Sequence, residues 1–300
     1  MYSRNILIAG FGALLAATAF GAGAARADCN LSIQPAQDQW LIQHDPFAGD
    51  ALQRQFDVAL VNLGDSRCIG KLEIDLHGDP YGLTRPGDDQ RVAYILIDER
   101  SGNDTTPRTG RSPPRPNGRP INVAAGERDL VRFTFAVDTE AVLGAGVYAQ
   151  TAFLAVAAND GAPIAERPVS LAVNVIPAAV MGLKGEYQRI NGVARIDLGE
   201  LTEGPRSLGT SLFVLSTGGY RVSVQSSNRG RLRLGVSEWY VDYGLAIGSD
   251  TVNLVQGDDF EVISHRPRAD DYPLSVNIGE VSGRRAGEYS DVLTFTIAAL

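Results

Sequence analysis

Cysteine and histidine are scarce in this chain, whose 300 residues include two Cys and three His. Zinc sites draw several ligands from these residue types, so such a small number of Cys and His residues does not predict a metal site. Asp75, His77 and Asp79 alternate along one predicted strand, but a solvated strand face before a turn explains them. A Gly-x-Ser-x-Gly motif and a phosphate-binding loop are also missing. We therefore nominate no catalytic residue, predict no metal and no cofactor, and do not expect an enzyme.

Long hydrophobic runs are limited to one, over residues 6–20, with Arg4 before it and Ala25-Arg26-Ala27 after it. This run is shorter than the roughly 20 residues that a membrane span needs. A basic start, an apolar centre and small residues at the end are typical of a cleaved signal peptide. Residues 1–27 are predicted to be that peptide, so the mature chain would begin near Asp28 and be exported.

The two cysteines, Cys29 and Cys68, both lie in the first half of the chain. A single pair in an exported protein predicts one disulfide, and metal binding without a nearby His is the poorer alternative. Acidic residues outnumber basic ones: the formal net charge of −8 becomes −10 once Arg4 and Arg26 leave with the signal peptide. That charge argues against nucleic acid as a partner.

Helical periodicity is almost absent, and apolar residues alternate with polar ones in most segments, as in Val169, Leu171, Val173 and Val175. Alternation of this kind predicts an all-β chain of half-buried strands. A weak internal repeat runs in the same order through both halves. One of its segments is Ala145-Gly-Val-Tyr148 in the first half and Ala286-Gly-Glu-Tyr289 in the second. We therefore predict two related immunoglobulin-like sandwiches, an N-terminal domain over 28–176 and a C-terminal domain over 182–300.

The second predicted sandwich lacks a counterpart to one strand of the first. After the strand that begins at Val147, the first half adds another over 169–176, whereas the corresponding strand of the second half, 288–300, has none after it. A sandwich without its last strand has an open groove and an unpaired edge, which is a hazard unless another chain fills it. The sequence thus predicts an incomplete second domain.

Four segments of the second half resemble the spore coat protein U type of secreted pilin domain. They are Ile196-Asp-Leu-Gly-Glu-Leu, Ser211-Leu-Phe-Val-Leu-Ser, the run from Gly219 to Leu232, and Ala286-Gly-Glu-Tyr-Ser-Asp-Val-Leu-Thr-Phe-Thr-Ile. The likeness covers 182–300 well and 29–176 only loosely. It implies the archaic chaperone–usher pili of bacterial outer membranes, whose subunits are immunoglobulin-like sandwiches without their seventh strand.

The resemblance also implies partners and a location. A periplasmic pilus chaperone lends the missing strand, an outer-membrane usher exports the subunit, and an adjacent pilin subunit replaces that strand in the fibre. The acceptor groove would be bordered by the last strand, with Tyr289, Leu293, Phe295 and Ile297 facing the core. The protein would pass through the periplasm and end in a cell-surface fimbrium.

The N-terminus decides the expected place in the fibre, because family members that donate a strand carry it before their first cysteine. Only Asp28 would precede Cys29 after cleavage, so we expect a tip subunit that mediates adhesion through its first domain. The alternatives are a structural coat or shaft subunit without ligand binding, and a secreted β-sandwich enzyme.

The adhesive surface is predicted with two segments of the first domain. Trp40, Leu41, Ile42 and Phe47 place aromatic and apolar residues beside a turn, and such residues on exposed loops mark recognition sites. The alternative is that Trp40, Ile42 and Phe47 pack in the first strand region. Residues 99–120 form a predicted loop rich in arginine, of which Arg108, Arg111 and Arg115 are candidates. The ligand would be an unknown surface or glycan.

Overall fold

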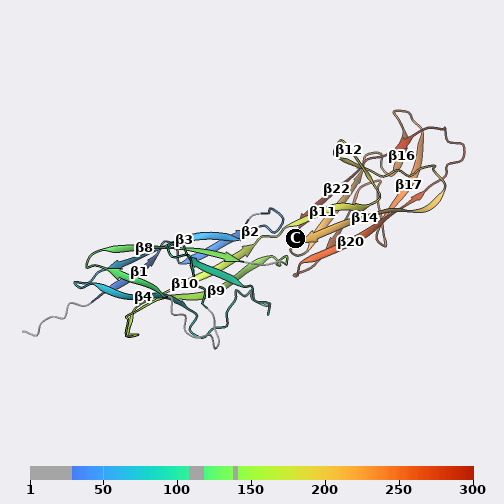
Figure 1. Ribbon diagram of the computed structural model, residues 1–300. Coiled ribbons are helices and arrows are strands. Elements are labelled where there is room, and N and C mark those ends of the chain that lie inside the picture. Colours follow the sequence, from blue (N-terminus) through green and yellow to red (C-terminus); the bar gives the residue numbers. More distant parts are fainter. Residues whose placement is uncertain (1–28, 50, 108–117, 138–140) are drawn as a thin grey trace, which may run out of the picture.

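The computed structural model describes residues 29–49, 51–107, 118–137 and 141–300, and these residues form strands and turns without a helix. The all-β prediction is confirmed. Figure 1 shows two bodies end to end, one built from β1–β10 and the other from β11–β22, called here the first half and the second half. Among these residues there is no helix that could cross a bilayer.

The first half is a sandwich of two five-stranded sheets, ordered β1-β3-β8-β5-β6 and β2-β10-β9-β4-β7. Its strands are β1 (Leu31–Pro35), β2 (Gln39–His44), β3 (Gln53–Asn62), β4 (Cys68–Asp75), β5 (Tyr94–Asp98), β6 (Asn103–Asp104), β7 (Arg119–Val123), β8 (Arg128–Val137), β9 (Gly146–Ala157) and β10 (Pro163–Val175). Alternating residues of both sheets meet in one core, where Trp40 stacks on Phe56 with ring centroids 5.1 Å apart.

The strand β10 closes this sandwich. It pairs antiparallel with β9 and parallel with β2, so it occupies the position between those two strands. Its inward residues Val169, Leu171, Val173 and Val175 are all buried. The first half therefore completes its own core.

The second half has a larger sheet, β11-β14-β20-β17-β16-β21 with β18 on β17, and a three-stranded sheet, β19-β15-β22; β12 and β13 form a separate hairpin. The strands are β11 (Ala179–Gly185), β12 (Gln188–Ile190), β13 (Val193–Arg195), β14 (Gly204–Ser216), β15 (Tyr220–Ser226), β16 (Arg231–Leu234), β17 (Tyr240–Ile247), β18 (Asp250–Val252), β19 (Asp258–Val262), β20 (Arg268–Ile278), β21 (Tyr289–Ser290) and β22 (Leu293–Ala299). A second, separate core lies between the sheets.

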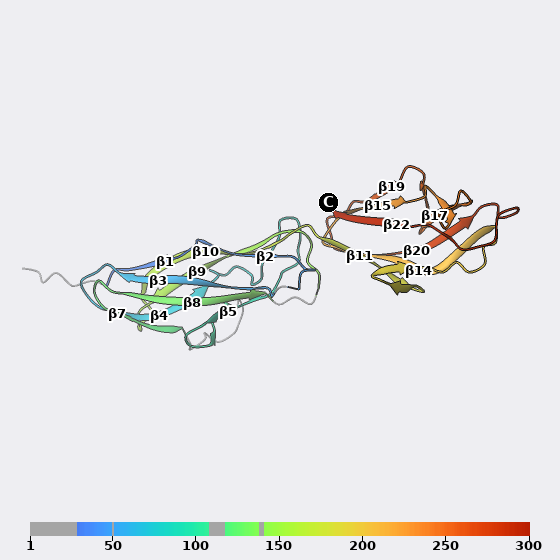
Figure 2. The same cartoon turned by 90° about the horizontal axis from the view of Figure 1, so that it is seen from above.

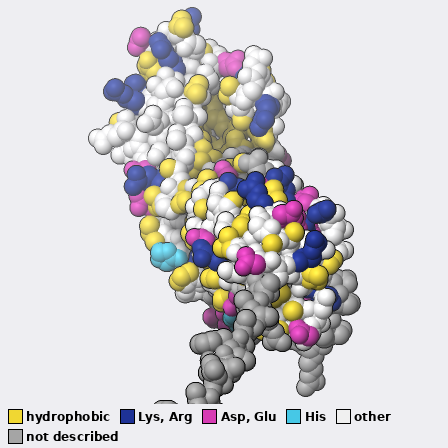
Figure 3. Space-filling model, turned by 90° about the vertical axis from the view of Figure 1, so that its left-hand side faces the viewer, with side chains coloured by type: hydrophobic (Ala, Val, Ile, Leu, Met, Phe, Trp, Pro, Cys, Tyr) yellow, Lys and Arg dark blue, Asp and Glu magenta, His cyan; other side chains and the backbone are white. Residues whose placement is uncertain are grey.

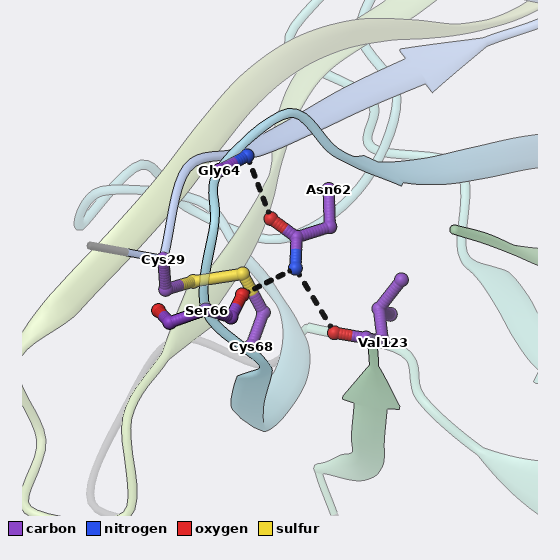
Figure 4. Close-up of a disulfide and its surroundings, with 6 residues drawn as sticks. All are labelled: Cys29, Asn62, Gly64, Ser66, Cys68 and Val123. Carbon is purple, nitrogen blue, oxygen red and sulfur yellow. Dashed lines mark hydrogen bonds between the residues drawn. A yellow bond between two sulfur atoms is a disulfide. The ribbon is translucent and has the colours of Figure 1, made fainter. Parts of the chain in front are cut away.

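Cys29 and Cys68 form the predicted disulfide (Figure 4). Beside it, the fully buried Asn62 side chain donates to the carbonyls of Ser66 (2.7 Å) and Val123 (3.1 Å) and accepts from the amide of Gly64 (3.0 Å). Closing a loop with a sequence separation of 39 restricts the unfolded chain and adds about 4 kcal/mol of stability. The turns at this end of the first half are thus held covalently and by a satisfied polar side chain.

The sequence repeat corresponds to a tyrosine corner in each half. The Tyr148 hydroxyl donates to the carbonyl of Gly144 (3.1 Å), and the Tyr289 hydroxyl donates to that of Arg285 (2.8 Å), four residues back in both cases. Such a corner ties a tyrosine near the start of a strand to the backbone just upstream. The repeat glycine has φ 150° at Gly287, where a side chain would also collide with Leu234.

Three residues, 176–178, join the halves, and Thr217 holds this linker. Its amide donates to the carbonyl of Ala178 (2.9 Å), and its hydroxyl oxygen accepts from the amide of Ala178 (2.9 Å). Between the halves themselves, the Ala145 amide donates to the Thr217 carbonyl (2.9 Å) and Arg85 reaches the His265 carbonyl (3.4 Å). Figure 2 shows β22 ending close to this junction.

Candidate functional site

The strand β22 has a partner on one edge only. It pairs antiparallel with β15, and no described residue pairs with its other edge. Its inward side chains, Leu293, Phe295 and Ile297, pack against the second core but stay half-buried. Their neighbours across β15 differ, because Val224, opposite Phe295, and Val222, opposite Ile297, are completely buried. The difference arises because β15 is flanked on both sides and β22 is not.

The strand β11 shows the same pattern on the opposite sheet. Among the residues that the structure describes, it pairs with β14 alone, and its inward residues Ala179, Met181 and Leu183 are half-buried. The β14 residues that face two of them, Val214 and Leu212, are buried. Two half-covered apolar rows, one on each sheet, therefore border a groove. We call it the β11–β22 groove and define it by Ala179, Met181, Leu183, Leu293, Phe295 and Ile297.

Figure 3 shows a hollow lined by hydrophobic side chains in the upper body. The proportion of buried to half-buried residues in the two cores also indicates an open groove in the second half. Among the described residues, the first core has 29 buried members and six half-buried ones, whereas the second has 14 and 15. A closed sandwich buries most of its apolar face, so the second half has a core that is open on one side.

The first half shows what would fill such a groove. There β9 is the counterpart of β22, and its inward residues Tyr148, Ala152, Leu154 and Val156 are all buried because β10 lies alongside. By the same geometry, a strand in the β11–β22 groove would run antiparallel to β22, as β10 runs antiparallel to β9. Free backbone groups on β22 would bind its main chain, and the core would receive every second side chain.

Polar groups close the core beside the end of β22. Tyr220, opposite Ala299, is buried, and its hydroxyl donates to Asp270 (2.7 Å) and contacts the Tyr272 hydroxyl (2.5 Å). Burial raises the pKa of Tyr220 far above its ordinary value, and these two neighbours raise it further. Burial alone would raise the pKa of Asp270, but hydrogen bonds from Arg268 and Tyr220 outweigh it and lower the pKa.

Tyr289 lies outside the row of groove residues. It belongs to β21, which pairs with β16, and its hydroxyl completes the tyrosine corner. Its ring is half-buried against the second core. Tyr289 therefore holds the turn that leads into β22, and contact between it and an incoming strand stays a prediction.

The predicted adhesive segment around Trp40 divides between core and surface. Trp40 and Ile42 are 0% and 4% exposed, so the prediction that they contact a ligand is wrong, and the packing alternative holds for them. Leu41 and Phe47 are half-buried, and β2 ends beside Val175, near the junction with the second half. Arg108, Arg111 and Arg115, like the predicted signal peptide at 1–27, lie outside the described residues.

A site that the sequence did not indicate lies at the other end of the first half. There Arg119, only 8% exposed, pairs with Asp98 (3.2 Å) and Asp129 (3.1 Å). The three residues are distant in sequence and carry no local motif. As for metals, no three His, Cys, Asp or Glu side chains gather into a possible ion site within the described residues.

Neither a family model nor a curated protein sequence matches this chain, whereas solved structures do. One is the complex of CsuC with CsuE, a chaperone–tip adhesion subunit pre-assembly complex from archaic chaperone–usher Csu pili of Acinetobacter baumannii. It has 13% identity and a TM-score of 0.47, over 89% of this chain and 99% of that one. Another is CfaE, the adhesive subunit of CFA/I fimbria of enterotoxigenic Escherichia coli. It has 11% identity and a TM-score of 0.38, over 87% of this chain and 92% of that one. A third is the E. coli chaperone DraB, with 9% identity and a TM-score of 0.26, over 81% of this chain and 86% of that one. Identities and TM-scores this low carry no argument about function.

Proposed function

We propose that this protein is a subunit of a chaperone–usher pilus whose second half accepts a strand in the β11–β22 groove. A periplasmic chaperone supplies the strand during export, and an adjacent pilin subunit supplies it in the fibre after passage through the outer-membrane usher. The observation that carries the proposal is the pair of half-buried apolar rows on β11 and β22. An exposed apolar edge of this kind needs a partner strand.

The first half supports a position at the tip of the fibre. Its own β10 lies between β9 and β2, so the position that is open in the second half is already filled in the described part of the first half. A closed half therefore projects from the end of the fibre and mediates adhesion at the cell surface. Its ligand would be met by the turns and strand ends farthest from the junction, since the other end faces the second half.

The test is to supply the strand in the same chain. A turn copied from residues 158–162, which connect β9 to β10, is joined after Leu300 and followed by a strand with Val or Ile at every second position and polar residues between them. These apolar residues are placed in phase with Leu293, Phe295, Ile297 and Ala299. We expect the second half to melt cooperatively and as a monomer. A net gain of ~2 kcal/mol would raise its Tm by roughly 5–10 °C.

The control is the same fusion with the strand shifted by one residue, which turns its apolar face to solvent. Scanning calorimetry and light scattering compare both fusions with the unmodified chain. If the unmodified chain is already a monomer that melts as cooperatively as the in-phase fusion, or if both fusions behave alike, the groove does not accept a strand.

A further inference from the structure

A cavity of about 590 Å³ lies in the first half, at the end farthest from the junction. We call it the pole pocket. Its lining comes from the end of β5 and the turn after it, from β7, and from the turn into β8: Asp98, Arg100, Ser101, Arg119, Asn122 and Asp129, with Pro120, Val123, Glu127 and Arg128. Figure 3 looks onto this end and shows basic, acidic and hydrophobic side chains mixed across it. Volumes of this size suit small ligands.

The back of the pole pocket is held by ion pairs and hydrogen bonds. Arg119 is fixed by its two carboxylate partners, and Asp98, 1% exposed, also accepts from the Arg100 amide (3.1 Å) and the Ser101 hydroxyl (2.9 Å). Below it, the buried Asn62 side chain and the nearby disulfide hold the turns that carry Val123. Polar groups held in place before a ligand arrives lose little freedom on binding.

The exposed rim offers both donors and acceptors. The Asn122 side-chain oxygen accepts from Arg67 (2.9 Å), which leaves the two amide hydrogens of Asn122 to donate outward. Asp129 is 31% exposed, so its carboxylate can accept further hydrogen bonds. Pro120, exposed on β7, adds an apolar ring between these groups.

The balanced charges of the pocket favour a neutral ligand over a strongly ionic one. Three arginines face three acidic residues in its lining, so an anion would meet carboxylates and a cation would meet guanidinium groups. A hydroxyl group suits both, because it donates to a carboxylate and accepts from an amide or guanidinium. Several hydroxyls on an otherwise apolar ring would use the fixed polar groups together with Pro120.

We propose that the pole pocket binds a neutral hexose-type carbohydrate, an inference that rests on the proposed adhesive role of the first half. The sugar hydroxyls lie between Asn122 and Asp129, and the ring packs on Pro120. The pocket needs no strand in the β11–β22 groove, because the first half has its own closed core.

The experiment presents the full exported chain to immobilised glycans that end in neutral glucose, galactose or mannose, and to sialylated and sulfated glycans. We expect saturable binding to neutral glycans only. Asn122→Ala and Asp129→Asn should each raise the Kd about tenfold. Asn122 is exposed, so its replacement leaves the fold intact even if Asp129→Asn loosens Arg119. The matched control is Asp259→Asn, an exposed aspartate of the second half.

Three results would overturn the proposal: no binding to any neutral glycan, preference for sialylated or sulfated glycans, or neutral binding that neither pocket variant weakens. The strand-fusion experiment reads the second half by calorimetry, so its failure and the failure of glycan binding are separate results. If the fusion folds cooperatively but binds no neutral glycan, the proposal of strand acceptance stands and the proposal of a carbohydrate site is refuted.

Discussion

Phe295 gives the sharpest test of strand acceptance, because the groove leaves its side chain half-buried while its partner Val224 is 1% exposed. Phe→Ala in a closed core costs about 3–5 kcal/mol, which includes the loss of burial and the cavity left behind. In the open chain, part of the ring already faces water, so only part of that free energy is lost. In the in-phase fusion the new strand covers the ring.

We therefore expect Phe295→Ala to cost ~2 kcal/mol more in the fusion than in the unmodified chain. The measurement is guanidinium unfolding of the second half in four proteins, each background with and without the substitution, treated as a double-mutant cycle. Val224→Ala is the matched control, since its side chain is buried in either background and should lose the same free energy in both.

An equal cost of Phe295→Ala in the two backgrounds would refute the reasoning, because it would mean that the added strand does not cover the groove. A larger difference for Val224→Ala than for Phe295→Ala would do the same, since it would show a general loosening of the open half. Agreement in the control and a difference at Phe295 would locate the strand beside β22.

Two further predictions concern the stability of each half. The lowered pKa of Asp270 means that its contribution to folding is present above the unfolded-state pKa of 3.8 and is lost as the pH falls through the lower folded value. Asp270→Asn in the fusion should therefore reduce the loss of second-half stability in an acid series, and an unchanged pH profile would contradict this. Tyr148→Phe and Tyr289→Phe should each remove about 1 kcal/mol by deleting a corner hydrogen bond, each from its own half. Calorimetry resolves the halves, and a shift in the wrong transition would count against two equivalent corners.

Alternation in the sequence was enough to predict the all-β fold. Leu293, Phe295 and Ile297, which the resemblance to pilin domains placed facing the core, do pack against the second core. The cysteine count was enough for the disulfide. The same alternation, applied to Trp40 and Ile42, would have placed them in the core, where the structure has them. The interpretation of those residues as an adhesive surface gave more weight to their aromatic and apolar character than to the alternation of buried and exposed positions along the strand.

The pole pocket could not be predicted from the sequence for a different reason. Asp98, Arg119 and Asp129 come together only because the fold brings the end of β5, the start of β7 and the start of β8 near one another. Charged residues at strand ends are common, and nothing local distinguishes the three that meet. The half-buried state of β11 was equally hidden, because its short run Ala179-Val-Met-Gly-Leu gives little sign that one of its edges has no neighbour.

The junction has a mechanical consequence. Among the described residues, only the bonds from Ala145 to Thr217 and from Arg85 to His265 cross between the halves, because the other bonds of Thr217 go to the linker itself. At roughly 1 kcal/mol each, two such hydrogen bonds hold the halves together only weakly. We expect a pull on the two ends of the chain to break these two bonds first, so that the first half can reorient about residues 176–178. Such reorientation would let the junction, rather than the core of the second half, take up a bending load.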